Sequence, residues 1–211
     1  HVGPTNAGKT HDALTAFRSA GCALYLGPLR LLAAEVADTS NERGCPCSLV
    51  TGEERRLVEG AQHVASTVEM FDPQGMWDVA VIDETQMLGD PNRGGAWSRA
   101  LIGVDADELH ICCAPEGLDI VRRVLDGCRE RFGDTYRVQR HERLNPLLPF
   151  PQLVRFPEDV QPGDACIAFS KRDVHAAAAE LHNAGRTCCV VYGALPHAVR
   201  QAEARRFREG D

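Results

Sequence analysis

The first ten residues carry glycines, a lysine and a threonine at the spacing that binds a nucleoside triphosphate. Residues 3 to 10 fit the phosphate-loop pattern G-x-x-x-x-G-K-[ST] at every fixed position. The glycines let backbone N–H groups turn toward phosphates, Lys9 adds a positive charge, and the Thr10 hydroxyl can ligate Mg²⁺ at a helix N-terminus. The predicted cofactor-binding residues are Gly3, Pro4, Thr5, Asn6, Ala7, Gly8, Lys9 and Thr10.

Two carboxylates follow an apolar run further along the chain. Residues 79–82 predict a buried strand that delivers Asp83 and Glu84 at its C-terminal end. In phosphoryl transfer, Asp83 would share a Mg²⁺ ion with Thr10, and Glu84 would orient or deprotonate water. Gln86, on the same side of an extended chain, is placed to sense the γ-phosphate. The predicted catalytic residues are Lys9, Asp83, Glu84 and Gln86, and the predicted metal ligands are Thr10 and Asp83. The alternative is a chance glycine loop beside an unrelated, solvated acidic turn.

Strand and helix patterns alternate around these motifs. The predicted strands are residues 21–28, 47–50, 63–67, 79–82 and 109–113, and the predicted helices are residues 11–20, 29–37, 96–101 and 118–132. This alternation predicts an α/β fold, with a parallel sheet covered on both faces. Ligands of such sheets bind beyond the C-terminal ends of the strands, where the phosphate loop and Asp83 are both expected.

Three prolines predict a domain boundary. Pro146, Pro149 and Pro151 cannot continue a helix or a central strand, so we place one domain at residues 1–145 and the start of a second at 146–211. In the second, residues 165–170 and 187–193 predict strands, and helical faces recur around residues 174–181 and 199–207. The second domain is therefore expected to be α/β as well, and incomplete.

Composition limits the class of protein. The net charge of −7 argues against a chain that holds nucleic acid through a broadly basic surface, although a local basic groove is compatible with it. The nine cysteines form no C-x-x-C pair, which argues against a cysteine-ligated zinc site, and we expect them to be reduced core residues of an intracellular protein. No apolar stretch reaches the roughly 20 residues that cross a bilayer, so no membrane partner is expected.

Seven segments together resemble a known family. They are residues 3–10, 27–33 (GPLRLLA), 49–55 (LVTGEER), 63–70 (HVASTVEM), 81–87 (VIDETQM), 169–171 (FSK) and 192–196 (YGALP). In this order they resemble the Suv (suppressor of var) family of mitochondrial degradosome RNA helicases, DExH-like members of helicase superfamily two. Thr85 stands where the family commonly has Ile, and Cys113-Ala114-Pro115-Glu116 departs from the family's Gly-Glu-Pro.

The resemblance implies a RecA-like fold in two domains and ATP-driven unwinding of RNA, with some activity on DNA. It implies ATP and Mg²⁺ as cofactors, RNA and a degradosome exoribonuclease as partners, and the mitochondrial matrix as location. It also implies that Arg30, Thr51, Gly52 and Thr67 contact the nucleic-acid backbone, which suits tracking without sequence preference. Each of these four could equally be a capping or turn residue.

Two other functions share parts of the pattern. A nucleoside kinase of the type-two thymidine kinase kind also joins Gly-Pro-x-x-x-Gly-Lys-Thr to Asp-Glu-x-Gln, but it carries a four-ligand zinc lobe that this chain lacks the C-x-x-C pairs to build. A nucleotide-binding module without turnover is the third alternative. The sequence opens directly on the phosphate loop, and we expect a fragment whose arginine finger lies beyond Asp211. The 211 residues alone are then expected to bind ATP and Mg²⁺, hydrolyse ATP barely and not unwind RNA.

Overall fold

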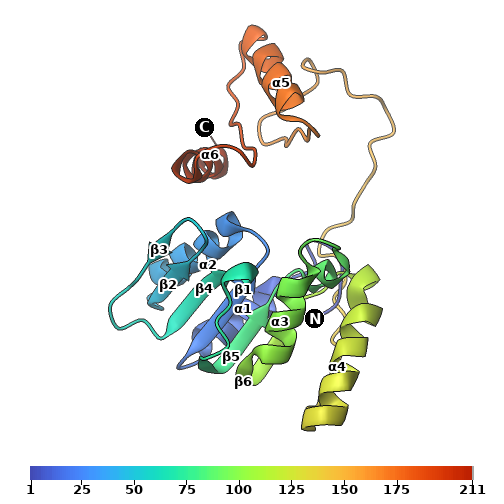
Figure 1. Ribbon diagram of the computed structural model, residues 1–211. Helices are drawn as coiled ribbons and strands as arrows, with labels where there is room; N and C mark the ends of the chain where they lie inside the picture. Colours follow the sequence, from blue (N-terminus) through green and yellow to red (C-terminus); the bar gives the residue numbers. More distant parts are fainter. Residues whose placement is uncertain (211) are drawn as a thin grey trace. The chain divides into compact units, whose positions relative to one another are not determined.

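The computed structural model describes residues 1–210, which divide into two compact units between Pro146 and Leu147 (Figure 1). We describe each unit by itself.

The first unit is built on a six-stranded sheet, as the alternating pattern predicted. The strands are β1 (Ala23–Gly27), β2 (Cys47–Val50), β3 (Arg55–Arg56), β4 (His63–Thr67), β5 (Met76–Ile82) and β6 (Asp105–Ile111). Their order in the sheet is β3-β2-β4-β1-β5-β6. All neighbours pair in parallel except β2 and β3. The short antiparallel strand β3 was not predicted, because two residues are too few to show a period.

Residues at the start of the chain extend this sheet beyond β6. Val2 forms parallel bridges to Cys113 on one side and to Arg140 on the other. The Val2 N–H donates to the Gln139 carbonyl at 2.8 Å, and the His141 N–H donates to the Val2 carbonyl at 2.7 Å. The strand that leads into the phosphate loop is thus represented by residues 1–3, and its outer neighbour is residues 139–141.

Helices cover both faces of the sheet. On one face, α1 (Lys9–Ser19) and α2 (Arg30–Glu42) pack on alternate strand residues such as Tyr25 and Val81. On the other face, α3 (Gly94–Gly103) packs on Leu26 and Ile82, and α4 (Leu118–Phe132) lies on the same side (Figure 1). The strands are apolar on both faces because both are covered, which is the property of a parallel sheet.

The side chains that join the helices to the sheet belong to the apolar helical faces that the sequence predicted. Phe17 on α1 and Trp97 on α3 are both fully buried, and each such burial contributes roughly 1.5–3 kcal/mol. Helix α2 runs five residues beyond the predicted end at Ala37, because residues 38–42 remain compatible with helix after the apolar face ends. Three short 3₁₀ turns complete the unit: η1 (Val68–Met70), η2 (Thr85–Gly89) and η3 (Pro115–Gly117).

The second unit contains two helices, α5 (Lys171–Asn183) and α6 (His197–Glu209), where helical faces were predicted. Helix α5 begins at a cap, since the Ser170 hydroxyl accepts from the Asp173 N–H at 3.1 Å. The predicted strands at 165–170 and 187–193 are wrong, because neither segment forms a strand in the described part of this unit. Two such segments could supply only a two-stranded parallel pair, which is marginal without further neighbours, and the Phe169 side chain is fully exposed.

The nine cysteines are all free thiols, but only part of the set belongs to the core. Four are buried: Cys47, Cys112, Cys113 and Cys128. Cys166 is exposed and the other four are half-buried, so the expectation of nine core cysteines is wrong. The exposed one lies in a segment that was predicted to be a buried strand. Among the described residues, no helix is long and apolar enough to span a bilayer.

Candidate nucleotide site and helicase motifs

The phosphate loop curls tightly around the ammonium group of Lys9. Gly8 has φ of 79° and Asn6 has φ of 59°, so two loop residues take the left-handed conformation. Glycine adopts it freely and asparagine tolerates it better than most residues. Helix α1 begins at Lys9, whose Nζ donates to the Gly3 carbonyl at 2.6 Å and to the Pro4 carbonyl at 2.9 Å. The charge therefore lies within the loop, at the end of a helix where backbone N–H groups point outward.

Thr10 and Asp83 meet across the end of the sheet. The Thr10 hydroxyl donates to the Asp83 carboxylate, at 3.2 Å from Oδ2 and 3.3 Å from Oδ1. A hydroxyl and a carboxylate oxygen are hard donors of the kind that Mg²⁺ prefers, and the ion usually takes only one or two protein ligands beside phosphates and water. These two residues therefore fit a magnesium ion bound with a nucleotide, and their role as metal ligands stays a prediction.

Asp83 is the most enclosed acidic group of the site. Burial raises the pKa of its carboxyl, and the charge of Glu84 acts in the same direction. Hydrogen bonds oppose this rise: the Glu84 N–H donates at 2.9 Å and the Tyr25 hydroxyl at 3.2 Å. Tyr25 itself is buried beside this carboxylate, and its pKa is raised well above the usual value. The sheet thus holds Asp83 in a costly position, which a bound cation would relieve.

Glu84 and Gln86 lie together, but not along an extended chain as predicted. Glu84 takes a left-handed conformation, with φ of 51° and ψ of 44°, and the chain then turns into η2. The Gln86 amide nitrogen still reaches the Glu84 carboxylate with a short hydrogen bond. A non-glycine residue in this conformation costs about 1–3 kcal/mol and is frequent at functional sites. The turn after Glu84 therefore brings the side chains of Glu84 and Gln86 into contact.

A neighbouring loop fixes the other end of Gln86. The Ala114 N–H donates to Gln86 Oε1 at 3.0 Å. A Cβ atom on Gly117 would lie 2.4 Å from the Gln86 Cβ, so only glycine fits there. The hydrogen bond to Gln86 comes from the backbone N–H of Ala114. Residues 113–117 can therefore hold Gln86 although their side chains depart from the family pattern. Gly117 was not singled out from the sequence, and Ala114 was named only within a segment that departs from the family pattern, because their roles depend on missing volume and on a backbone group.

Thr85, the other departure from the family, is fully buried and satisfied. Its hydroxyl lies 3.1 Å from the Ile82 carbonyl and 3.0 Å from the Cys112 carbonyl, and its N–H also donates to Cys112. A hydroxyl can thus replace an aliphatic side chain here without an unpaired buried group.

The four residues expected to bind nucleic acid lie at or just after the C-terminal ends of β1, β2 and β4. Arg30, in the first turn of α2, pairs with Glu53 beside Gly52. Thr51 is 3% exposed, and its hydroxyl accepts from the Glu54 N–H at 3.0 Å, while Thr67 is 5% exposed. In this conformation, Thr51 therefore acts as a turn residue and Arg30 as an ion-pair partner. The parallel sheet gathers these residues at the ends of β1, β2 and β4, while the nucleotide motifs lie at the ends of β5, β6 and residues 1–3.

A network from α3 connects these two groups of strand ends. The Arg93 guanidinium donates to the Pro28 carbonyl at 2.5 Å and to Glu69 Oε1 at 2.6 Å. It also lies 5.2 Å from the Trp97 ring centre, and Trp97 Nε1 donates to the Asp83 carbonyl at 2.9 Å. Trp97 was predicted only as a core residue, and Arg93 was not singled out. A basic residue at the start of a helix is common, so the sequence alone does not predict that Arg93 connects Pro28 and Glu69 to α3.

The fold and the loop around Lys9 together define an α/β domain of the phosphate-loop class. Among solved structures, S. cerevisiae Dbp5 bound to RNA and ADP BeF3 matches 99% of this chain and 63% of its own, with a TM-score of 0.61 and 12% identity. A Dbp5 L327V complex with the same ligands gives a TM-score of 0.57 at 13% identity. This likeness confirms the RecA-like fold.

Residues 1–141 match the family model of the DEXQ-box helicase domain of Suv3, and the chain belongs to that family.

Curated relatives agree with this assignment. The ATP-dependent RNA helicase SUV3 homolog, mitochondrial, of Caenorhabditis elegans is 45% identical over all of this chain, which covers 29% of that protein. DExH16, mitochondrial, of Arabidopsis thaliana is 45% identical over 99% of the chain and 36% of its own length. SUPV3L1, mitochondrial, of Mus musculus is 42% identical, with coverages of 99% and 27%. The chain thus spans about a third of these relatives. The comparisons give no support to a thymidine kinase.

Proposed function

We propose that this protein is an ATP-dependent RNA helicase and that the chain described here carries its ATP-binding domain. The observation that carries the proposal is the meeting of Thr10 and Asp83 at the mouth of a phosphate loop that encloses Lys9. Membership of the Suv3 helicase family, whose curated relatives are named as RNA helicases, supports RNA as the substrate. We extend the proposal to some activity on DNA, as the resemblance in the sequence implies.

In the proposed site, the loop from Gly3 to Thr10 binds the phosphates of ATP, and Lys9 neutralises their charge. Thr10 and Asp83 hold Mg²⁺, which when bound stabilises charge on the phosphates. Glu84 orients and deprotonates the attacking water, while Gln86 contacts the γ-phosphate. The hydrogen bond from Gln86 to Glu84, and the one it receives from the Ala114 N–H, support a role in which Gln86 reports the state of the nucleotide to residues 113–117.

RNA is proposed to run along the ends of β1, β2 and β4. Arg30 binds a phosphate after its pair with Glu53 opens, and Gly52 and the backbone at Thr51 and Thr67 approach the sugar–phosphate chain. Residues 146–211 are proposed to belong to a second RecA-like domain. By relation to the mitochondrial helicases, the protein acts in RNA turnover in the mitochondrial matrix, with an exoribonuclease as partner.

Steady-state ATP hydrolysis by the whole protein tests this proposal. We expect single-stranded RNA to increase the rate, and the same preparation to displace a labelled strand from an RNA duplex. Transfer of phosphate to a nucleoside would instead support the kinase alternative. Tight ATP binding without turnover, with RNA or without it, would support a nucleotide-binding module. A Glu84→Gln preparation, purified in parallel, shows whether the activity belongs to this protein.

A further inference from the structure

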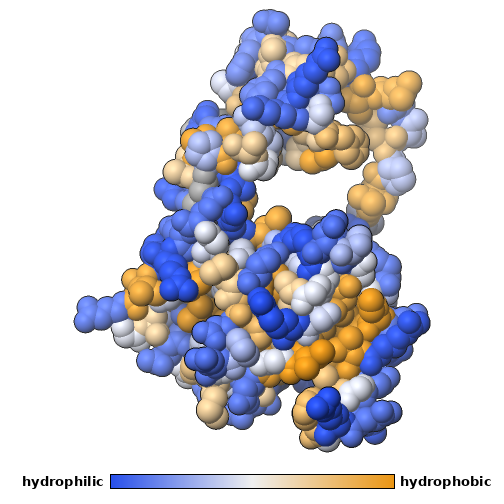
Figure 2. Space-filling view, viewed as in Figure 1, coloured by the Kyte–Doolittle hydropathy of each residue, from blue (hydrophilic) through white to orange (hydrophobic). Residues whose placement is uncertain are grey.

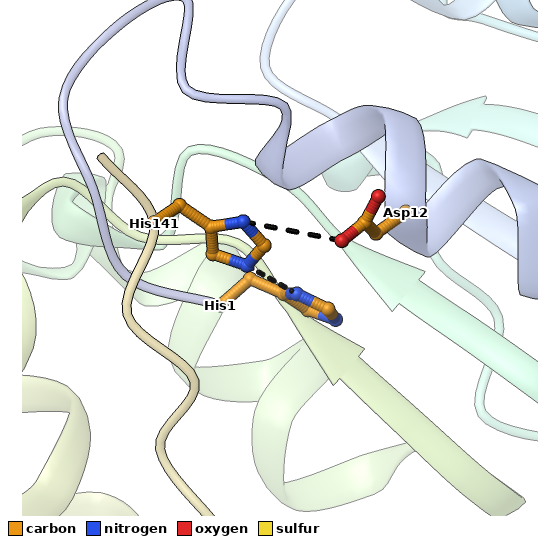
Figure 3. A group of neighbouring side chains, drawn as sticks. All are labelled: His1, Asp12 and His141. Carbon is orange, nitrogen blue, oxygen red and sulfur yellow. Dashed lines mark hydrogen bonds and ion pairs between the residues drawn. The ribbon is translucent and has the colours of Figure 1, made fainter. Parts of the chain in front are cut away.

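Three histidine rings lie in a row beside the phosphate loop. His110 Nδ1 is 2.9 Å from His1 Nε2, and His1 Nδ1 is 2.9 Å from His141 Nε2. Carboxylates flank both ends: Glu108 Oε1 is 3.2 Å from His110 Nε2, and Asp12 Oδ2 is 3.9 Å from His141 Nδ1. Figure 3 shows Asp12, His141 and His1 pointing toward one another. None of these groups has a part in the proposed nucleotide chemistry.

Two acceptors at the inner end of this row are not joined by a hydrogen bond. Each of the two contacts between ring nitrogens needs one proton, and the three neutral imidazoles supply enough. His141 Nδ1 and Asp12 Oδ2, in contrast, lie 3.9 Å apart, which is too far for a hydrogen bond. A nitrogen and a carboxylate oxygen at this distance can share one cation, either a proton or a metal ion.

The inner part of the row has the composition and the spacing of a metal site. One ring nitrogen each from His1 and His141 and a carboxylate oxygen of Asp12 all lie within 4.8 Å of one another. Ligands about 2.0–2.2 Å from a tetrahedral zinc ion lie roughly 3.3–3.5 Å apart, so small side-chain rotations suffice. Two imidazoles and a carboxylate suit zinc, while hard ions such as Mg²⁺ prefer oxygen alone.

The surroundings of the row suit a bound ion. The His110 ring contacts the free nitrogen of His1, as an outer partner that orients a metal-binding histidine does. His1, Asp12 and His110 also line a groove between β6, α4 and residues 135–139, which gives solvent access.

We propose that His1, Asp12 and His141 form a zinc-binding site, with His110 as the outer partner of His1. The three ligands come from the segment that leads into the phosphate loop, the first turn of α1 and the outermost segment of the sheet. A bound ion would tie these three parts together. The inference is independent of the proposed helicase activity, because it concerns residues outside the nucleotide site.

Zinc titration of the protein without nucleotide, in excess Mg²⁺, tests the site. His1 should be preceded by a short histidine-free extension, so that its ring and not a free amine offers the ligand. We expect one tight zinc equivalent, weakened at least tenfold by Asp12→Ala and by His141→Ala. Substitution of Co²⁺ for zinc should give the absorption bands of a four-coordinate ion in the wild type only. Because Asp12 is exposed, its variant should fold, which circular dichroism checks.

Two control variants locate the binding. His11→Ala removes an exposed histidine next to Asp12 and should leave zinc affinity unchanged. Cys188→Ser tests a competing pair, since Cys188 Sγ lies 3.9 Å from His182 Nε2. The proposal is overturned if Asp12→Ala and His141→Ala both bind zinc as the wild type does, if only Cys188→Ser loses it, or if no stoichiometric zinc binds and the row simply takes up a proton.

Discussion

The ammonium group of Lys9 lies where the phosphates of a nucleotide would meet it, and two loop carbonyls hold it there. We predict that Lys9→Ala weakens ATP binding by at least about tenfold, because a charge-assisted hydrogen bond contributes about 1.5–3 kcal/mol. Isothermal titration with ATP and Mg²⁺ measures this. Lys171, the other lysine of the sequence, lies on α5 and offers the matched control. Equal affinity of Lys9→Ala and wild type would overturn the phosphate-loop assignment.

Glu84 combines a strained backbone with a carboxylate that accepts from Gln86. Glu84→Gln preserves shape but removes the base, so nucleotide affinity should be retained while turnover falls about 10²- to 10⁴-fold. RNA-stimulated hydrolysis by the whole protein is the measurement. Glu59→Gln, at an exposed loop position, should turn over normally. Hydrolysis by Glu84→Gln at the wild-type rate would show that another group activates the water.

Asp83 should reduce the stability of the protein when no cation is bound. Since burial raises its folded pKa above that of the unfolded chain, the folded state binds more protons, and stability falls as pH rises through that interval. Without nucleotide or Mg²⁺, Asp83→Asn should therefore melt higher than the wild type at neutral pH. The difference should shrink as the solution is acidified. A wild type that melts higher at every pH would contradict this account of the carboxylate.

At the scale of elements, Arg93 and Trp97 connect the residues after β1 and β4 to Asp83, which follows β5. Arg93→Ala should reduce the stimulation of hydrolysis by RNA more than it reduces basal hydrolysis, because it disconnects Pro28 and Glu69 from the helix that holds Asp83 through Trp97. Arg93→Lys should rescue this only in part, since an ammonium lacks the planar fork. Comparison of kcat with the RNA concentration for half-stimulation separates the two effects. Arg123→Ala, on the exposed side of α4, is the control, and an equal loss there would contradict the prediction.

The sequence predicted an element well where its own residues show a complete helical or strand period. Helix α4 shows its apolar face over 15 residues, and the predicted bounds match the observed Leu118–Phe132. Residues 165–170 are equally apolar, yet they form no strand, because a strand exists only through its neighbours. The residue pair Thr10 and Asp83 was predictable from two motifs. The contacts of Arg93, Gly117 and residues 139–141 were not, because they depend on how distant segments meet.

At the scale of the whole molecule, the residues that begin the second unit expose large apolar side chains. Leu147, Leu148 and Leu153 are 75–97% exposed, and Figure 2 shows orange residues along this segment. Limited trypsin digestion should cut first at Arg143 or Arg155, leaving a product that contains the whole sheet of the first unit. Mass spectrometry of the early products identifies the cut. First cleavage within α4, at Arg123 for instance, would contradict the expectation that residues 143–155 are the most accessible part of the chain.

The last residues of the first unit are hydrogen-bonded to the start of the chain. After residues 139–141 complete the edge of the sheet, the Leu144 N–H donates to the Asn6 carbonyl at 2.9 Å. Gly3 lies so close to the His141 carbonyl that a Cβ atom would approach it to 2.4 Å. A pulling force applied to the chain at Leu147 would therefore reach the backbone of the predicted phosphate loop after only a few residues, through these hydrogen bonds.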